Sequence, residues 1–347
     1  MLHHSPARVS RRAVLGTALA LPTAAALAAC GDGTPSTGTD TTPTKITYVT
    51  NFGVFGRDAY AWLGQTAGHF ADHGLEVEIQ PGTGTEGNLA ALIGGTADFA
   101  AIDLAGAAMV HGAIDGATGY VAIAAIHQLP LATVMGRASD IQRPADLAGA
   151  KIGITPGAIT ELLLDPWADL AGVDPHSFER VPMGGPDLIP ALVTRDVDAI
   201  CQFIPGLPTV ENAVGEDIIV FPYSDYIDDL YGVGLFTRAD LAAENPDLCI
   251  RVRDAFVAAL THALDDPAAA GAALEAAVPE TSAEGAAAEL EVMEPYCRTT
   301  GVPVGALDEV RMSQHLALLE ALGLSRLGAH ESSEIVAWDL TLSPAAR

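Results

Sequence analysis

The sequence predicts an α/β fold built as two lobes. Strand-like and helix-like segments alternate along the chain, which is typical of α/β proteins. The alternation starts again near Ser139, and about 300 residues follow Lys45, which is enough for two lobes. We expect residues 45–137 to form the first part of lobe 1 and residues 138–230 to form lobe 2. Residues 231–347 should then return to lobe 1 and end in helices.

The first unit combines short strands with two helices. Residues 75–79 read Leu-Glu-Val-Glu-Ile, and this strict alternation predicts a half-exposed strand. Residues 58–73 have apolar side chains at helical spacing and end before Gly74, a good helix C-cap. A short helix is expected at 88–93. The remaining expected strands of this unit are 46–50, 97–102, 121–126 and 132–136.

The second unit repeats this kind of pattern, although no internal repeat of short period is found. A one-turn helix is expected at 143–149, and a strand at 231–237 could lead back to the first lobe. From Asp247 to near Trp338 the pattern is almost purely helical. The other expected elements are strands at 151–154, 198–203 and 218–221 and helices at 160–171 and 186–192.

The N-terminus is typical of a bacterial lipoprotein signal. Arg8, Arg11 and Arg12 precede an apolar run from Ala13 to Ala29, and small residues fill its end. We expect residues 1–29 to be a signal peptide and Cys30 to carry the lipid; an uncleaved N-terminal helix is the alternative. The paired arginines indicate export by the twin-arginine route. Residues 30–44 are polar and predict a flexible tether.

The charge of the chain excludes several kinds of partner. The net charge is −27, and the chain is 49% hydrophobic, so a sizeable core under an acidic surface is expected. Removing residues 1–29 takes away three arginines and no acid. Such a surface repels nucleic acid and anionic lipid headgroups.

Three cysteines remain after Cys30. Cys201 lies in an apolar strand, which predicts an inert buried thiol. Cys249 and Cys297 could pair in an oxidising compartment or stay free, and sequence does not decide between these.

Two motifs that could hold a cofactor or a metal have simpler interpretations. Residues 82–87, Gly-Thr-Gly-Thr-Glu-Gly, match a dinucleotide-binding pattern, but the strand before them is half polar and the helix after them is short. A plain turn, or a helix N-terminus facing a polar ligand, explains them as well. His69 and His73 lie four residues apart, a spacing that can hold zinc, but His73 also suits a helix C-terminus. We expect no cofactor, no metal and, without a catalytic motif, no enzyme.

Several phrases resemble one protein family when they are taken in order. They are AGHFADHGLEVEI, GNLAALIGGTADFAAID, DIQRPADLAGAKIGI, TRDVDAI and the ENPDL helix that ends at Asp-Pro. The chain resembles the periplasmic-type solute-binding proteins of ABC importers. The subgroup it resembles most includes binders of the thiamine pyrimidine precursor, with nitrate, taurine and sulfonate binders as relatives.

The resemblance implies a type II periplasmic-binding fold with two crossover strands and a ligand held between the lobes. It also implies that the protein works with an ABC permease and its ATPase subunits. We expect a monomer held at the outer face of the cell membrane by its lipid.

The resemblance also indicates which loops should face the ligand. In the family these loops follow the strands, so the candidates here lie at strand ends. The ligand-binding residues expected on this basis are Phe52, Arg57, Asp58, Tyr60, Asp103, His127, Gln128, Thr155, Gly157, Gln202, Phe203 and Tyr231.

This candidate set favours a planar, nitrogen-bearing ligand such as an aminopyrimidine. Aromatic side chains would stack on the ring, Asp58 or Asp103 would accept hydrogen bonds, and Arg57 is the only base. The aromatic-Thr-Pro-Asn phrase of the pyrimidine binders is replaced here by Thr50-Asn-Phe-Gly, so other ligands stay open. The alternatives are a sulfonate, taurine or nitrate binder, or an enzyme or sensor domain on the same fold.

Overall fold

The computed structural model describes residues 42–111, 119–328 and 331–344. The expected signal peptide, Cys30 and most of the expected tether lie outside these residues. Within them, none of the helices combines the length and the apolar character that crossing a membrane requires.

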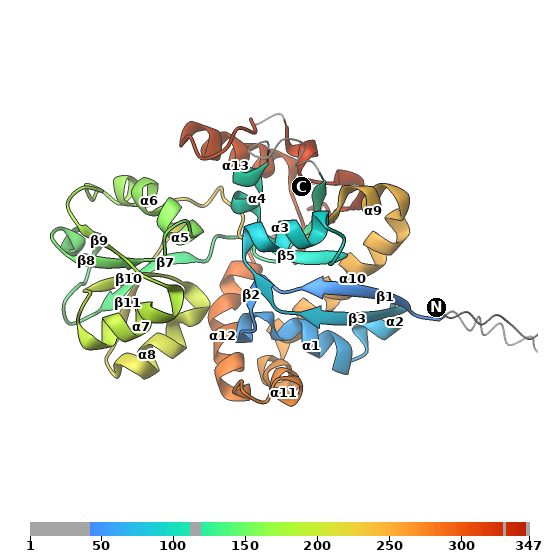
Figure 1. The fold of residues 1–347 in the computed structure, drawn as a ribbon, viewed down its shortest axis with the longest axis horizontal. Coiled ribbons are helices and arrows are strands. Elements are labelled where there is room, and N and C mark those ends of the chain that lie inside the picture. The colour runs from blue at the N-terminus through green and yellow to red at the C-terminus, as the bar shows by residue number, and fades with distance from the viewer. Residues whose placement is uncertain (1–41, 112–118, 329–330, 345–347) are drawn as a thin grey trace, which may run out of the picture. The chain divides into compact units, whose positions relative to one another are not determined.

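A first five-stranded sheet has the order β3-β1-β5-β12-β6 (Figure 1). Its strands are β1 (Thr44–Val49), β3 (Leu75–Gln80), β5 (Phe99–Asp103), β6 (Tyr120–Ala125) and β12 (Val233–Arg238). β1 pairs in parallel with β3 and β5, whereas β12 is antiparallel to both β5 and β6. The strand expected at 231–237 does therefore return to the first sheet. We call this sheet, with the helices packed on it, the first lobe.

Helices cover both faces of the first sheet. One face packs, through residues such as Ile46 and Tyr48, against α1 (Ala59–Thr66), α10 (Pro246–Asp265), α11 (Pro267–Ala277) and α12 (Ala283–Cys297). The other face packs, through residues such as Val49 and Ile102, against α3 (Thr85–Ile93), α4 (Leu104–Val110) and α13 (Glu309–Ala321). α9 (Ala239–Glu244) follows β12. The apolar residues that recur at helical spacing in these helices thus pack against the sheet.

Two expected helices are each broken into two. The helix expected at 58–73 becomes α1 and α2 (His69–Asp72), because Gly68 between them has a φ of 85°, a left-handed conformation that a helix does not contain. The helix expected at 160–171 becomes α5 (Ile159–Leu162) and α6 (Leu164–Leu170). Pro166 lies in the first turn of α6 and has no N–H to bond back to α5.

A second five-stranded sheet has the order β11-β7-β10-β8-β9. Its strands are β7 (Ala132–Arg137), β8 (Lys151–Ile154), β9 (Glu179–Pro182), β10 (Ala199–Phe203) and β11 (Ile218–Pro222). β8, β9 and β10 are parallel, and β7 runs antiparallel between β10 and β11. With α5, α6, α7 (Gly185–Thr194) and α8 (Leu207–Val214) it forms the second lobe (Figure 1).

The strand β7 differs from the sequence expectation, which placed residues up to 137 in the first lobe. It pairs with β10 and β11 over its whole length and so belongs to the second sheet. All of its residues are buried, so its sequence carries no alternation that would assign it to either sheet. The chain leaves the first lobe between Ala125 and Ala132.

Two segments connect the sheets, residues 126–131 and residues 223–232, and Arg311 of α13 holds them together. Its Nη2 donates to the carbonyls of Asp228, at 3.0 Å, and Leu230, at 3.1 Å, and also to that of Gln128. The guanidinium carbon lies 4.1 Å from the ring centroid of Tyr231, a cation–π contact. One side chain thus fixes both connections.

The C-terminal part is less helical than expected. Gly305 and Val336 form isolated bridges with Ala125 and Ala122 of β6, so extended chain covers the outer edge of the first sheet. Glycines and a proline, among them Gly301, Pro303 and Gly323, interrupt the helices here. The elements that the sequence did not predict are β2 (Phe52–Gly53), β4 (Gly82–Thr83), β9, α4, α8 and α9.

The three described cysteines are free and buried. Cys249 and Cys297 therefore do not form the disulfide that the sequence left open. Burial raises the pKa of the Cys201 thiol to about 12, which matches the inert thiol that was expected.

Candidate functional site

The candidate site lies where the strands of both sheets end. β1, β3, β5 and β6 end on one edge of the first sheet, and β8, β9 and β10 end on one edge of the second. Both connecting segments run between these two edges, since β6 ends and β12 begins on the first, while β7 begins and β11 ends on the second. Loops at such strand ends are where α/β proteins place binding residues.

The loop from Thr50 to Asp58 is the most exposed apolar feature of this edge. Phe52 is 53% exposed and Phe55 is 40% exposed. The guanidinium carbon of Arg57 lies 4.4 Å from the Phe55 ring centroid, and Arg57 Nη2 donates to the Phe52 carbonyl at 3.3 Å. The loop thus exposes two aromatic rings, whereas the Arg57 side chain is 12% exposed and lies 3.8 Å from the Asp58 carboxylate. Such a surface can stack on a flat ligand or contact a polar one.

A buried asparagine fixes this loop. Asn88 Nδ2 donates to the carbonyls of Thr50 at 2.9 Å, Asn51 at 3.0 Å and Ala101 at 3.0 Å. Its Oδ1 accepts the N–H of Thr83 at 3.0 Å. One side chain on α3 therefore ties together the residues after β1, the end of β4 and the middle of β5. The loop is held in place before any ligand arrives.

The glycine-rich motif at 82–87 serves this packing. A Cβ on Gly82 would lie 1.8 Å from the Thr50 carbonyl oxygen, and one on Gly87 would lie 1.9 Å from Thr83 Oγ1. Gly84 has a φ of 91°, a conformation that glycine adopts readily. The glycines are explained by the close approach of two loops, without a dinucleotide.

Asp58 and Tyr60 lie beneath the loop. Asp58 is 3% exposed, and burial, partly offset by Arg57, raises its pKa to about 6. The Tyr60 hydroxyl lies 2.7 Å from that of Tyr48, and its ring packs on Phe256 in the core. The structure thus places both residues under the surface, in contrast to Phe52 and Phe55.

Asp103 ends β5 and caps α4. Its Oδ1 accepts the Gly106 N–H at 2.9 Å, and its carboxyl is half-buried. Burial raises the pKa of Asp103 to about 6, and the backbone hydrogen bonds oppose that rise. It stays a predicted ligand residue, although one oxygen is used by the helix.

His127, Gln128 and Tyr231 are core residues of the connecting segments. His127 Nε2 lies 3.1 Å from Met293 Sδ, so this nitrogen carries the proton, and burial lowers the pKa of His127 to about 3. Gln128 Nε2 donates to the Ala306 carbonyl at 2.8 Å. The Tyr231 hydroxyl accepts the N–H of Asp308 at 3.0 Å. Most of their polar groups hold the two segments, but His127 Nδ1 is buried with no hydrogen-bond partner among the described residues.

The predicted residues of the second lobe lie at strand ends. Thr155 follows β8, and its Oγ1 is buried with no hydrogen-bond partner among the described residues. Gly157 is exposed with a φ of 76°, and its N–H donates to Glu161 Oε2 at 3.2 Å. Gln202 and Phe203 end β10 and are half-buried. Thr155 and Gln202 thus offer hydrogen-bonding groups, and Phe203 offers an aromatic ring.

Three residues that shape the site were absent from the predicted set: Phe55, Asn88 and Glu289. Phe55 lies in the predicted loop, and its aromatic character was a usable signal. Asn88 is a polar residue among Leu89 and other apolar neighbours, which also could have marked it. Glu289 contacts the loop from 232 positions away along the chain, and no sequence pattern indicates that.

The histidine pair considered for zinc is arranged differently. His69 Nε2 lies 3.0 Å from His262 Nδ1 on α10, and His73 Nδ1 bonds to the His69 carbonyl at 2.8 Å. In the described ranges, no three His, Cys, Asp or Glu side chains gather as metal ligands would. That no metal binds here stays a prediction.

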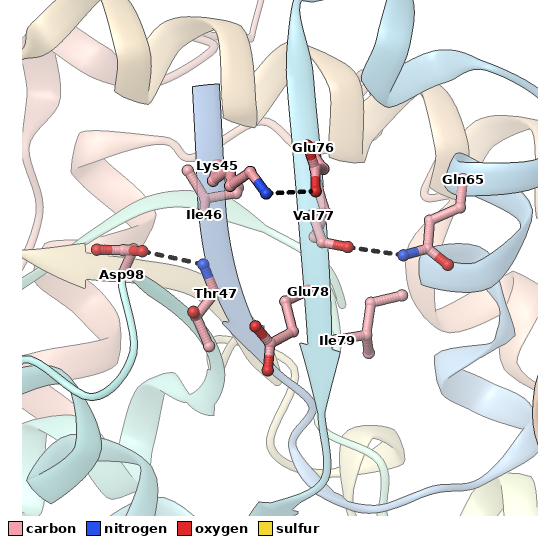
Figure 2. Close-up of a pocket in the computed structure, with 9 residues that line it drawn as sticks. All are labelled: Lys45, Ile46, Thr47, Gln65, Glu76, Val77, Glu78, Ile79 and Asp98. Carbon is pink, nitrogen blue, oxygen red and sulfur yellow. Dashed lines mark hydrogen bonds and ion pairs between the residues drawn. The ribbon is translucent and has the colours of Figure 1, made fainter. Parts of the chain in front are cut away.

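A pocket of the described chain lies elsewhere, away from the candidate site. It measures about 470 Å³ and lies over β1 and β3, between Lys45, Glu78 and Asp98 (Figure 2). Its polar groups already have partners: Lys45 pairs with Glu76 at 3.1 Å, and Gln65 donates to the Val77 carbonyl at 2.7 Å. It contains none of the predicted ligand residues. We regard it as an open sheet surface, because groups that are already paired gain little from a ligand.

Two sheets linked by two connecting segments that run between their strand ends define a fold of the periplasmic-binding-protein type. The chain belongs to the NMT1/THI5 like family, whose pattern matches residues 59–270.

Comparison with known proteins supports this assignment. A protein of Brucella abortus (strain 2308) that bears the name "Putative binding protein BAB2_1146" is 24% identical over 214 residues, which are 61% of this chain and 64% of the relative, less than two thirds of its length. The periplasmic aliphatic sulphonate binding protein SsuA of Escherichia coli superposes with a TM-score of 0.65 at 15% identity, covering 86% of this chain and 99% of SsuA. The desulfurization enzyme DszB has a TM-score of 0.58 at 17% identity, covering 85% of this chain and 97% of the enzyme.

Proposed function

We propose that this protein is the extracytoplasmic solute-binding component of an ABC importer. It captures one small ligand between its two lobes and delivers it to a membrane permease that works with an ATPase. The observation that carries the proposal is the exposed Phe52–Phe55 surface, with the Arg57 guanidinium packed on Phe55, held in place at the edge where both connecting segments meet the first sheet. Family membership and the binding-protein relatives support the same role.

The ligand we favour is a flat, nitrogen-bearing ring such as an aminopyrimidine. Phe52 and Phe55 offer stacking surfaces, and Asp103 offers a carboxyl group at a strand end. Arg57 is the one cation of the predicted set, and its guanidinium already lies on Phe55. A strong anion would usually find more positive charge than this.

A sulfonate, taurine or nitrate is the second candidate. The superposition on SsuA, a sulphonate-binding protein, favours it, and Arg57 could pair with an acid group. An enzyme is less well supported, although DszB has the same fold. All three described cysteines are buried, and burial raises the pKa of each thiol, which works against a nucleophilic thiolate.

Thermal unfolding with a panel of probes tests this proposal. The panel is 4-aminopyrimidine, taurine and nitrate, and a true ligand at a hundredfold excess over its Kd should stabilise the fold by about 2.7 kcal/mol. The variants R57A and F55A should lose that stabilisation, whereas R143A, which removes an exposed arginine outside the site, should keep it. A shift with taurine or nitrate alone would replace the aminopyrimidine assignment. Turnover of any probe would contradict the binding role.

The N-terminal part of the proposal concerns location. We propose that residues 1–29 direct export and that a lipid on Cys30 holds the protein at the outer face of the cell membrane as a monomer. The variant C30S should release the protein from membranes while ligand stabilisation is unchanged. A C30S protein that stays in the membrane fraction would contradict the anchor.

A further inference from the structure

Helix α12 supports the exposed loop of the candidate site from below. Its Glu289 Oε2 accepts the backbone N–H of Arg57 at 3.1 Å, and its carboxylate also receives a backbone hydrogen bond from Gly56. A Cβ on Gly56 would lie 2.4 Å from the Ala286 Cα, so the loop lies directly on the helix backbone. Such close contact restricts how the loop can be placed on α12.

The carboxylate of Glu289 accepts hydrogen bonds from the loop backbone. Burial raises the pKa of Glu289, and the nearby Asp58 adds to this, while Arg57 and the two amides lower it. A half-buried carboxylate is costly unless it is hydrogen-bonded, and here the two amides are its partners. Glu289 therefore fixes where the main chain of η1 (Gly56–Asp58) lies, and with it the direction of the Phe55 and Arg57 side chains.

The same helix contacts the other parts of the site. Met293 of α12 contacts His127, and the Tyr296 carbonyl accepts the Gln128 N–H at 2.7 Å. α12 also packs on η3 (Ile204–Gly206) and α8, directly after the β10 end that carries Gln202 and Phe203 (Figure 1). The loop of the first lobe is thus bonded to α12, and α12 also contacts the connecting segment and the second lobe.

We propose that Glu289 is a positioning residue for ligand binding: it holds the Phe55–Arg57 loop on α12 in the orientation that the ligand requires. Glu289 need not touch the ligand. The proposal rests on the proposed function, in which Phe55 and Arg57 contact that ligand.

Amide hydrogen exchange of the ligand-free protein tests the first half of the proposal. In E289A the Arg57 amide should exchange at least about tenfold faster than in the wild type, because one charge-assisted hydrogen bond is lost. E289Q retains an acceptor oxygen and should exchange at a rate near that of the wild type. E291A removes an exposed glutamate from the same helix and should change nothing. Unchanged exchange at Arg57 in E289A would overturn the proposal.

Ligand affinity, measured with whichever of 4-aminopyrimidine, taurine and nitrate stabilises the wild type, tests the second half. E289A should bind about tenfold more weakly, because the loop must now be ordered during binding, and E289Q should stay within about threefold. A looser loop with unchanged affinity would overturn the positioning role. If E289A does not fold, E289Q is compared with E289D, whose shorter side chain should lose both the exchange protection and the affinity. If the wild type binds no probe, the ligand assignment fails, and the exchange rates alone decide whether Glu289 fixes the loop.

Discussion

Replacing Asn88 with alanine should strongly destabilise the first lobe. The side chain is 1% exposed and its amide contacts three carbonyls and one N–H. The NH₂ group has two hydrogens for the three carbonyls, so the side chain makes the equivalent of three hydrogen bonds. Alanine would remove the partner of the Thr83 N–H and one donor from each carbonyl, while the Asn51 carbonyl keeps the Gly84 N–H at 3.1 Å and the Ala101 carbonyl keeps Asn51 Nδ2 at 3.4 Å.

The size of the effect follows from this inventory. Each of the three lost hydrogen bonds costs about 1 kcal/mol net, so we expect a loss of roughly 3 kcal/mol in the free energy of unfolding. The variant N88D keeps the oxygen that accepts from Thr83 but turns the donors into an acceptor facing carbonyls. It should therefore be at least as destabilised as N88A.

Equilibrium unfolding in urea measures these losses. The matched control is N212A, which removes an exposed asparagine on α8 and should change stability by less than about 0.5 kcal/mol. A loss below about 1 kcal/mol in N88A would refute the reasoning, since the loop would then hold its position without the amide. So would an N88D protein as stable as the wild type.

Three further predictions concern packing and pH. G56A should lose about 1–3 kcal/mol of stability in urea unfolding, because its Cβ would meet Ala286 of α12. G285A, which changes a glycine of α12 itself, should be neutral or slightly stabilising. Burial lowers the pKa of His315 to about 3. Wild-type stability should therefore fall as pH drops from 6.5 towards 3, by up to about 1.4 kcal/mol per pH unit. The variant H315N should lack this contribution, and identical pH profiles of the two proteins would contradict it. Asp58 has the opposite effect: because its pKa is raised, stability should fall as pH rises from about 4 to about 6. Over that range D58N should gain up to about 3 kcal/mol of stability relative to the wild type. A stability difference between the two proteins that does not change with pH would contradict this.

The sequence was most informative about the strands. The buried strand around Phe99 and the alternating strand at 75–80 were predicted within about two residues, because apolar runs and period-two alternation follow directly from burial. The sheet to which β7 belongs could not be predicted. A strand buried on both faces fits either sheet, and the choice depends on pairing with β10 and β11, which are distant in sequence.

The candidate site was predictable in part. Strand-end positions indicated the loop with Phe52 and Arg57, because loops after strands are where ligands bind in such folds. Sequence did not distinguish exposed side chains from those that the core uses, such as Tyr60 and Gln128. Tyr60 lies at the start of α1 and Gln128 follows β6, and only the partners of their polar atoms, Tyr48 and Ala306, separate them from ligand residues.

The loop is also held by residues that no local pattern reveals. Asn88 ties together the residues after β1, the end of β4 and the middle of β5, and Glu289 reaches the loop from the last third of the chain. Arg311 fixes both connecting segments in the same way, from α13. Long-range hydrogen bonds of this kind give the site its geometry but leave no mark on the neighbouring sequence.

Native mass spectrometry of the protein with 4-aminopyrimidine, taurine and nitrate tests the central claim most directly. The account predicts a one-to-one adduct with one of these probes, present in the wild type and in R143A and absent in R57A and F55A. An adduct that persists equally in R57A and F55A would place binding elsewhere. No adduct with any of the probes would contradict the ligand classes proposed for this site.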